Sequence, residues 1–183
     1  MKKAFVAVAA LLAAGLFSMD LMAQSHQRSR SIYGELLGAS QGIGINYDAR
    51  FNKGKSDGFG WRTGLGFGYA YSSNFVAFNI DGDVVDTYNQ MFRAAVPLEL
   101  NYLLGKKNSK LETGGGAALC MDIYTSDTGA KTEASFGVVT YLSVGYRLVT
   151  HSGFLFRVGV LPSFNFDGSN LSLYPYIGFG KAF

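Results

Sequence analysis

Apolar and polar residues alternate with a period of two along most of the chain after residue 31. In the segment 91–104 one face carries Phe92, Ala94, Val96, Leu98, Leu100, Tyr102 and Leu104, and the other carries Met91, Arg93, Ala95, Pro97, Glu99 and Asn101. Successive side chains of a β-strand point to opposite faces, so this pattern predicts strands with one apolar and one polar face. After residue 31 no window has a sustained helical stripe or an apolar run long enough for a membrane-spanning helix.

Eight segments alternate in this way. They are 31–40, 42–51, 59–73, 91–104, 110–124, 135–149, 153–166 and 171–183. An even number of strands closes antiparallel, and tilted strands of about 9 to 11 residues span a bilayer. The polar face is made of Gly, Ser, Asn and Tyr with few charges, which favours a barrel whose apolar face meets lipid. The sequence therefore predicts an all-β fold, an eight-stranded antiparallel transmembrane up-and-down β-barrel.

Composition excludes several other classes of protein. The 183 residues are 48% hydrophobic and 16% charged, which is far too apolar for a disordered chain. Cys120 is the only cysteine, which excludes an internal disulfide and a zinc module. The formal net charge is +3 without the clustered basic excess of a nucleic-acid binder, so we expect no nucleic acid as a partner.

The N-terminal segment has the three parts of an export signal. Lys2 and Lys3 precede an apolar run over 4–17, and Ala23 is a small residue suited to a cleavage site. The run is shorter than the roughly 18 residues that a spanning helix needs. We therefore expect a cleaved signal peptide over 1–23, a short periplasmic tail over 24–30, and a barrel over 31–183 in the outer membrane of a Gram-negative cell.

The few charges of the barrel segments fall mainly on the polar face. That face carries five acids and five arginines: Glu35, Asp48, Glu99, Glu112, Asp122, Arg50, Arg62, Arg93, Arg147 and Arg157. An eight-stranded barrel is just wide enough for side chains to fill its interior. Because an unpaired buried charge costs several kcal/mol, these groups are expected to pair. The sequence predicts a lumen filled by a balanced charge network, with Gly rows on neighbouring strands making room for the larger side chains.

The connections between the segments alternate in length and charge. Short, mostly basic connections lie at 53–58, 105–109 and 150–152, and more acidic ones lie at 74–90, 125–134 and 167–170. Transmembrane barrels have short periplasmic turns and longer outer loops, which places both termini in the periplasm and 74–90 outside. Asp81, Asp83 and Asp86 in that longest loop are weak candidates for contacts to a divalent cation, since a complete calcium loop needs more ligands.

Two prolines interrupt the predicted strands. Pro162 and Pro175 lie in segments that a closed barrel pairs on both sides. Proline cannot donate to a strand ladder, so we expect a local bulge at each.

Several stretches of the mature chain resemble a family of small outer-membrane barrels. They are Ser31–Gly38, Ile45–Phe51, Pro97–Lys107, Leu111–Gly116, Gly145–Arg147 and Phe156–Gly159. The chain is thereby similar to the OmpA/OmpX-like eight-stranded proteins over nearly all of its mature length. The resemblance implies insertion by the barrel-assembly machinery, with Gly178, Phe179 and the terminal Phe183 as the C-terminal insertion signal. It implies no reaction.

Residues suited to catalysis are poorly placed in this arrangement. Some small barrels modify lipid A with a His, a Ser and an acid near the outer leaflet, but His26 falls in the tail and His151 in a periplasmic turn. Glu99 and Glu112 share the lumen face with arginines, which favours salt-bridge packing over acid–base work. We expect no enzyme, no cofactor and no metal site.

The predicted function is that of a monomeric outer-membrane barrel in contact with membrane lipid and lipopolysaccharide. Its role would be structural, or a surface interaction through the extracellular loops. A small-solute pore stays open as an alternative, and so does a lipid-A-modifying enzyme. A third alternative is an exported soluble barrel that holds an apolar ligand, which requires the apolar face to point inward.

Overall fold

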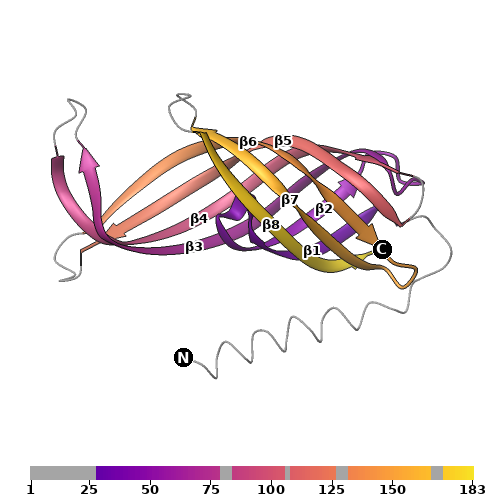
Figure 1. Cartoon of the computed structure of the whole chain (residues 1–183), viewed down its shortest axis with the longest axis horizontal. Helices are drawn as coiled ribbons and strands as arrows, with labels where there is room; N and C mark the ends of the chain where they lie inside the picture. Colours follow the sequence, from indigo (N-terminus) through magenta and orange to yellow (C-terminus); the bar gives the residue numbers. More distant parts are fainter. Residues whose placement is uncertain (1–27, 79–83, 106–107, 127–131, 166–170) are drawn as a thin grey trace, which may run out of the picture.

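The computed structural model describes residues 28–78, 84–105, 108–126, 132–165 and 171–183. Eight strands follow one another around a closed barrel (Figure 1). They are β1 (Arg30–Leu37), β2 (Gly42–Arg50), β3 (Gly58–Phe78), β4 (Val84–Leu104), β5 (Ser109–Thr125), β6 (Thr132–Val149), β7 (Phe154–Asn165) and β8 (Leu171–Ala182). Each strand pairs antiparallel with the next, and β1 pairs with β8 to close the ring. The predicted eight-stranded antiparallel up-and-down barrel is confirmed.

The two faces of the wall are sorted as the alternation predicts. Leu100 and Leu142 on the outer face are 63% and 54% exposed, whereas Arg62 and Arg157 on the inner face are 1% and 0% exposed. A soluble barrel would have the opposite arrangement, with apolar side chains inside. Among the described residues no helix is long and apolar enough to cross a membrane.

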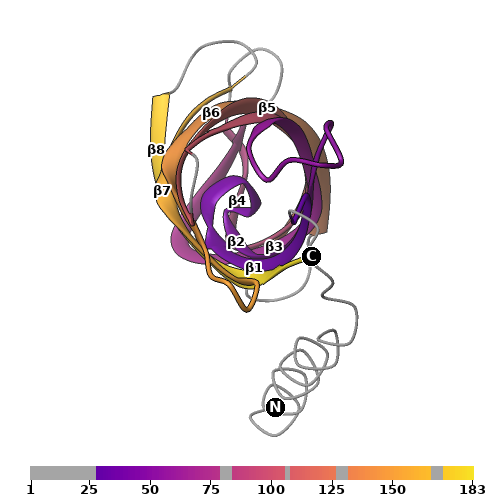
Figure 2. The same ribbon diagram turned by 90° about the vertical axis from the view of Figure 1, so that its right-hand side faces the viewer.

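The predicted first strand, 31–40, is wrong at its end. β1 stops at Leu37, and a short 3-10 turn, η2 (Gly38–Ser40), follows with all three residues buried. Figure 2, viewed along the barrel, shows this indigo turn inside the ring of strands. Leu37, Gly38 and Gln41 have φ angles of 62°, 60° and 52°, the left-handed region that allows so sharp an inward bend. The connection between β1 and β2 therefore occupies the lumen.

Glycine makes room for this inward turn. A Cβ at Gly66 would overlap the Cβ of Ser40, and one at Gly44 would overlap the Ser40 hydroxyl oxygen. A larger residue at Gly66 would displace the backbone of the turn at Ser40, and one at Gly44 would displace at least the Ser40 hydroxyl. The Gly rows thus accommodate a loop as well as the large side chains that the sequence predicts.

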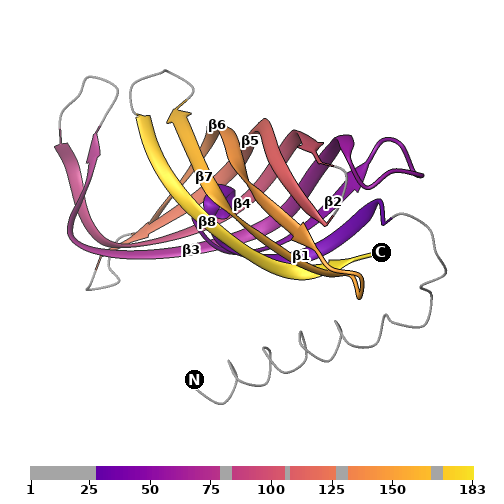
Figure 3. The same ribbon diagram turned by 45° about the vertical axis from the view of Figure 1, so that its right-hand side comes forward.

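The predicted outer loop 74–90 is also wrong, because every described residue in it belongs to a strand. β3 runs to Phe78 and β4 begins at Val84, and they pair along this stretch with two register shifts. Figure 3 shows β3 and β4 extending well beyond β1 and β2. Asp81 and Asp83 lie outside the described residues, and Asp86 lies in β4.

No register shift accompanies either proline, so the expected bulges are wrong. Pro162 pairs with Leu173 and Pro175 with Val160 in an unbroken β7–β8 register. Pro175 lies beyond the last β1–β8 pair, Leu37 with Tyr176, so its missing N–H faces no β1 partner. On the β6 side, no bridge is formed between the pairs Tyr141–Ser163 and Val144–Val160, which flank Pro162. Both prolines therefore lie where the strand ladder does not need a backbone N–H donor.

Candidate functional site

Arg157 on β7 connects two carboxylates at the centre of the lumen. Its Nη1 donates to Glu35 Oε2 at 2.8 Å, and its Nε donates to Glu112 Oε2 at 3.2 Å. Nη1 also donates to the Tyr33 hydroxyl, and the guanidinium lies over the rings of Tyr33 and Tyr176 at 4.5 and 4.9 Å. Every group of this set is shielded from solvent, so its charges have to be balanced by other buried groups.

Glu112 relieves a repulsion that the strand register creates. Arg147 and Arg157 are directly opposite each other across β6 and β7, an arrangement that is unfavourable for like charges. Glu112 accepts from Arg147 Nε at 2.8 Å and also from Arg157. One carboxylate therefore holds both guanidinium groups in place.

Asp48 on β2 is the second centre of the network. Its oxygens accept from Arg50 Nη2 at 2.7 Å and from Arg147 at 3.0 and 3.1 Å. Asn101 on β4 completes the set, donating to Asp48 at 2.8 Å and accepting from Arg50 at 2.5 Å. An amide suits this position because it supplies both a donor and an acceptor.

Arg62 on β3 links Glu35 to the last carboxylate of the lumen, Glu99. It pairs with Glu35 at 3.1 Å and with Glu99, its direct neighbour on β4, at 2.6 Å. Ser143 on β6 donates to Glu99 at 3.2 Å. Four acids and four arginines, contributed by seven consecutive strands, thus form one connected network, which we call the lumen cluster. Its members are Glu35, Asp48, Glu99, Glu112, Arg50, Arg62, Arg147 and Arg157.

Arg93 and Asp122 form a separate pair nearer the end of the barrel that carries the inward turn. They are direct neighbours on β4 and β5, joined by two hydrogen bonds of 2.5 Å. Arg93 also donates to the side-chain amide of Gln41, at the end of the inward turn. The side chains of the pair are 16% and 12% exposed, so solvent reaches them. The hydrogen bond between Arg93 and Gln41 connects the inward turn to the wall of the barrel.

Sequence reasoning places all ten charged residues on the lumen face but misses their neutral partners. Tyr33, Asn101 and Gln41 each bind an arginine of the site, and Lys110 is also buried at 3% exposure. Tyr33 and Asn101 share the phase of Glu35 and Glu99, two positions away, so the alternation contained their signal. Gln41 lies outside any strand, so the alternation carried no signal for it.

The other sequence-predicted residues are scattered. Gly178 lies on β8 opposite Glu35, Phe179 is 47% exposed on the outer face, and Phe183 is bonded through its backbone to Arg30. His151 is exposed in the β6–β7 turn, whereas His26 lies outside the described residues. Within the described ranges, no three His, Cys, Asp or Glu side chains are grouped as a metal site would need.

No family model matches the chain, and no curated protein matches it in sequence. Solved structures do match. The N-terminal barrel domain of Pseudomonas aeruginosa OprF aligns with a TM-score of 0.50 and 12% identity, covering 86% of this chain and 98% of that one. Ail, the attachment invasion locus protein of Yersinia pestis, aligns with a TM-score of 0.50 and 12% identity, over 86% and 99%. Neisserial surface protein A aligns with a TM-score of 0.52 and 11% identity, over 86% and 95%.

The chain has the fold of the small eight-stranded outer-membrane β-barrels. The predicted resemblance to such barrels is confirmed at the level of the fold. At these identities the outer-membrane barrel fold is shared while the roles of the individual proteins are not carried over. The role of this chain has to be argued from its own surfaces.

Proposed function

We propose that this protein is an outer-membrane barrel, closed to solutes, that acts at the cell surface by binding a partner through a sheet projecting from its outer rim. The location is supported by the outer wall, which presents large apolar side chains such as Leu65, Leu100 and Leu142, each more than half exposed. A continuous apolar band of this kind is stable only against lipid. The fold shared with known outer-membrane barrels supports the same location.

The projecting sheet is the observation that carries the surface role. In the described residues β2 pairs with β3 only as far as Phe67, and β7 pairs with β6 only from Val139 onward. Beyond these points β3, β4, β5 and β6 continue as a four-stranded sheet with an open edge on each side (Figure 1). Among the described residues the open edge of β6 covers 132–138, about 23 Å of strand at about 3.3 Å per residue.

An open strand edge is a binding surface for another extended chain. Its unpaired N–H and C=O groups can add a strand from a partner, and side chains beside it supply specificity. All seven residues of the β6 edge are exposed, and Phe136 in their midst is 79% exposed. An aromatic side chain so placed is a suitable anchor for an interface. We infer that the partner presents an extended polypeptide segment. The attachment named for the Yersinia pestis neighbour is compatible with such a role.

The edge is tested by probing an array of extracellular proteins with the folded barrel in lipid nanodiscs. We expect at least one bound protein, with an affinity that falls about tenfold in Phe136→Ser, because aromatic anchors dominate interface energies. Phe154→Ser is the matched control, since Phe154 is also exposed but begins β7 at the opposite end of the barrel. Equal loss in both variants, or no loss in either, would refute the edge as the binding surface.

The closed lumen leads to a separate prediction. Glu112 and Arg157 are both 0% exposed, and the lumen cluster links seven of the eight strands across the interior. Ions would have to break several buried ion pairs to pass, so we expect no steady conductance above bilayer leak in planar-bilayer recordings. A reproducible single-channel step from the folded protein would favour the small-solute pore instead.

The proposal includes no enzymatic activity. Glu99 and Glu112 are held in ion pairs with arginines, and His151 lies in an exposed turn at the end of the barrel that bears the chain terminus. The lipid-A-modifying alternative is tested by the mass of lipid A from expressing cells, which we expect to be unchanged.

A further inference from the structure

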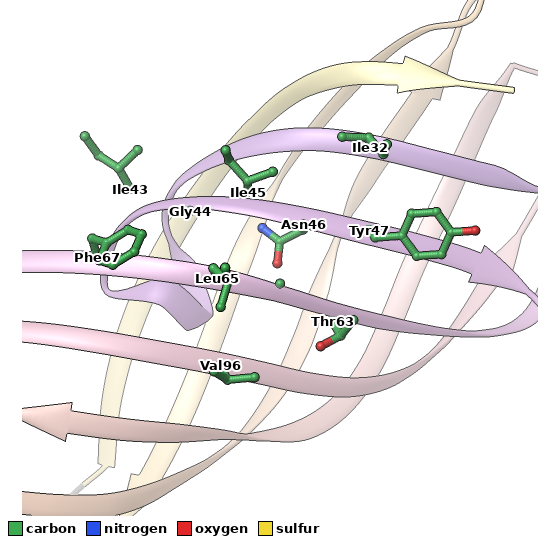
Figure 4. Close-up of a pocket in the computed structure, with 11 residues that line it drawn as sticks. Ile32, Ile43, Gly44, Ile45, Asn46, Tyr47, Thr63, Leu65, Phe67 and Val96 are labelled. Atoms are coloured by element: carbon green, nitrogen blue, oxygen red, sulfur yellow. The ribbon is translucent and has the colours of Figure 1, made fainter. Parts of the chain in front are cut away.

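A groove runs along the outer wall of the barrel over β1, β2 and β3. Its volume is about 710 Å³, within the range of about 300–1,000 Å³ typical of small-ligand sites. Figure 4 shows its apolar side chains: Ile32, Ile43, Ile45, Leu65, Phe67 and Val96. Gly44 and Gly64 also line it, and neither has a side chain to fill the space. The groove is therefore long, apolar and open to the side of the barrel.

The end of the groove nearest the chain termini is marked by Tyr47 and Thr63. These two residues pair across β2 and β3, and Tyr47 packs against Trp61 with ring centroids 5.5 Å apart. Aromatic residues of this kind concentrate where the hydrocarbon region of a bilayer meets the headgroups. The groove thus opens toward one interface of the membrane.

Two cations lie beside this end of the groove. Ile32, which lines the groove, pairs directly with Lys181 on β8. Arg30 is exposed on the same face of β1, two residues and about 7 Å before Ile32. Arg30 is also bonded through its backbone to the terminal Phe183, at the end of the barrel that carries the short turns. An apolar groove with positive charge at one end matches an acyl chain joined to an anionic headgroup.

We propose that this site binds one anionic phospholipid of the periplasmic leaflet, with an acyl chain in the groove and the phosphodiester against Arg30 and Lys181. The two features complement each other, because cations near a membrane surface attract anionic lipid and a groove adds contact area for the chain. A second copy of the protein on this face would bring Arg30 and Lys181 of both copies together, which is unfavourable. The barrel would then have a preferred lipid only on the wall formed by β1, β2 and β3.

The test is native mass spectrometry of the folded barrel released from bilayers that contain equal amounts of phosphatidylglycerol and phosphatidylcholine. We expect one phosphatidylglycerol to be retained in preference to phosphatidylcholine. The double variant Arg30→Gln/Lys181→Gln should lose this preference, with about a fivefold weakening for each cation removed. Thr63→Phe, which fills the groove with an apolar side chain on the lipid-facing wall, should lower the retention of phosphatidylglycerol without any change in charge.

The matched control is Lys53→Gln/Lys55→Gln, which removes two cations at the same end of the barrel from the exposed β2–β3 turn and should leave retention unchanged. Equal retention of both lipids by the wild type would overturn the proposal, and so would unchanged retention in the double variant or in Thr63→Phe. Release of a lipid-free dimer held through this face would also overturn it.

The proposal rests on the bilayer location proposed above but not on the projecting sheet. Each variant is first checked for heat-modifiable mobility on a detergent gel after refolding in lipid. A wild type that fails this check would remove the bilayer location and the lipid site together. A wild type that passes it but retains lipids without preference would overturn the lipid site alone.

Discussion

Replacing Arg157 with Met is expected to lower the free energy of unfolding by about 3–5 kcal/mol, the typical cost of breaking a buried ion pair by removing one partner. Arg157 donates to both Glu35 and Glu112, and all three side chains are 0% exposed. The substitution leaves two carboxylates without that cation in a region that water does not reach. The measurement is urea-induced unfolding of the barrel in phospholipid vesicles, followed by the fluorescence of Trp61, the only tryptophan.

Arg93→Met is the matched control for this prediction. Arg93 also pairs with a carboxylate, Asp122, but both side chains are in contact with solvent. Water can solvate the remaining carboxylate, so we expect a loss of only about 1 kcal/mol. Equal losses in the two variants would mean that burial of the lumen cluster does not govern its energetics.

Replacing Leu142 with Arg is expected to cost about 2–4 kcal/mol, because a cation on the lipid-facing wall near mid-membrane loses its hydration. Leu142 is 54% exposed near the middle of the paired part of β6. The same refolding assay in vesicles measures the effect. The polar Ser143 next to it is buried in the lumen, so a single residue separates the two environments.

Phe136→Arg is the control for the lipid-facing prediction. Phe136 lies on the same face of the same strand, but in the projecting sheet beyond the barrel rim. Water surrounds it there, and we expect a change of no more than about 0.5 kcal/mol. If Leu142→Arg were as harmless as Phe136→Arg, the wall at Leu142 would not face lipid.

The wall of the barrel was predictable because its physical signal is local. In a strand such as 91–104 every second side chain meets the same environment, so the alternation of Phe92, Ala94 and Val96 with Arg93 and Ala95 identifies both faces without any knowledge of the neighbours. The strand ends were less predictable. Along 72–90 apolar and polar residues no longer alternate regularly, although the hydrogen-bonded ladder of β3 and β4 continues.

The charged members of the lumen cluster were predictable by phase, but their pairing was not. Which arginine meets which carboxylate depends on the register between strands, as the direct opposition of Arg147 and Arg157 illustrates. The inward turn was missed because Gly38, Ala39 and Ser40 continue an acceptable strand pattern. Its cause is tertiary: Gly44 and Gly66 leave the space that Ser40 fills.

The unequal strand lengths have a consequence for the membrane itself. β1 has 8 residues, which at about 3.3 Å per residue and a tilt near 45° rise only about 19 Å. The apolar band of such barrels is about 25 Å tall, so the wall at β1 and β2 is too short to cover the hydrocarbon, whereas β3 and β4, with 21 residues each, more than span it. This hydrophobic mismatch can be relieved by local thinning of the bilayer and by tilting of the barrel. The protein would therefore stand tilted toward its short side and draw the outer headgroups down over the inward turn.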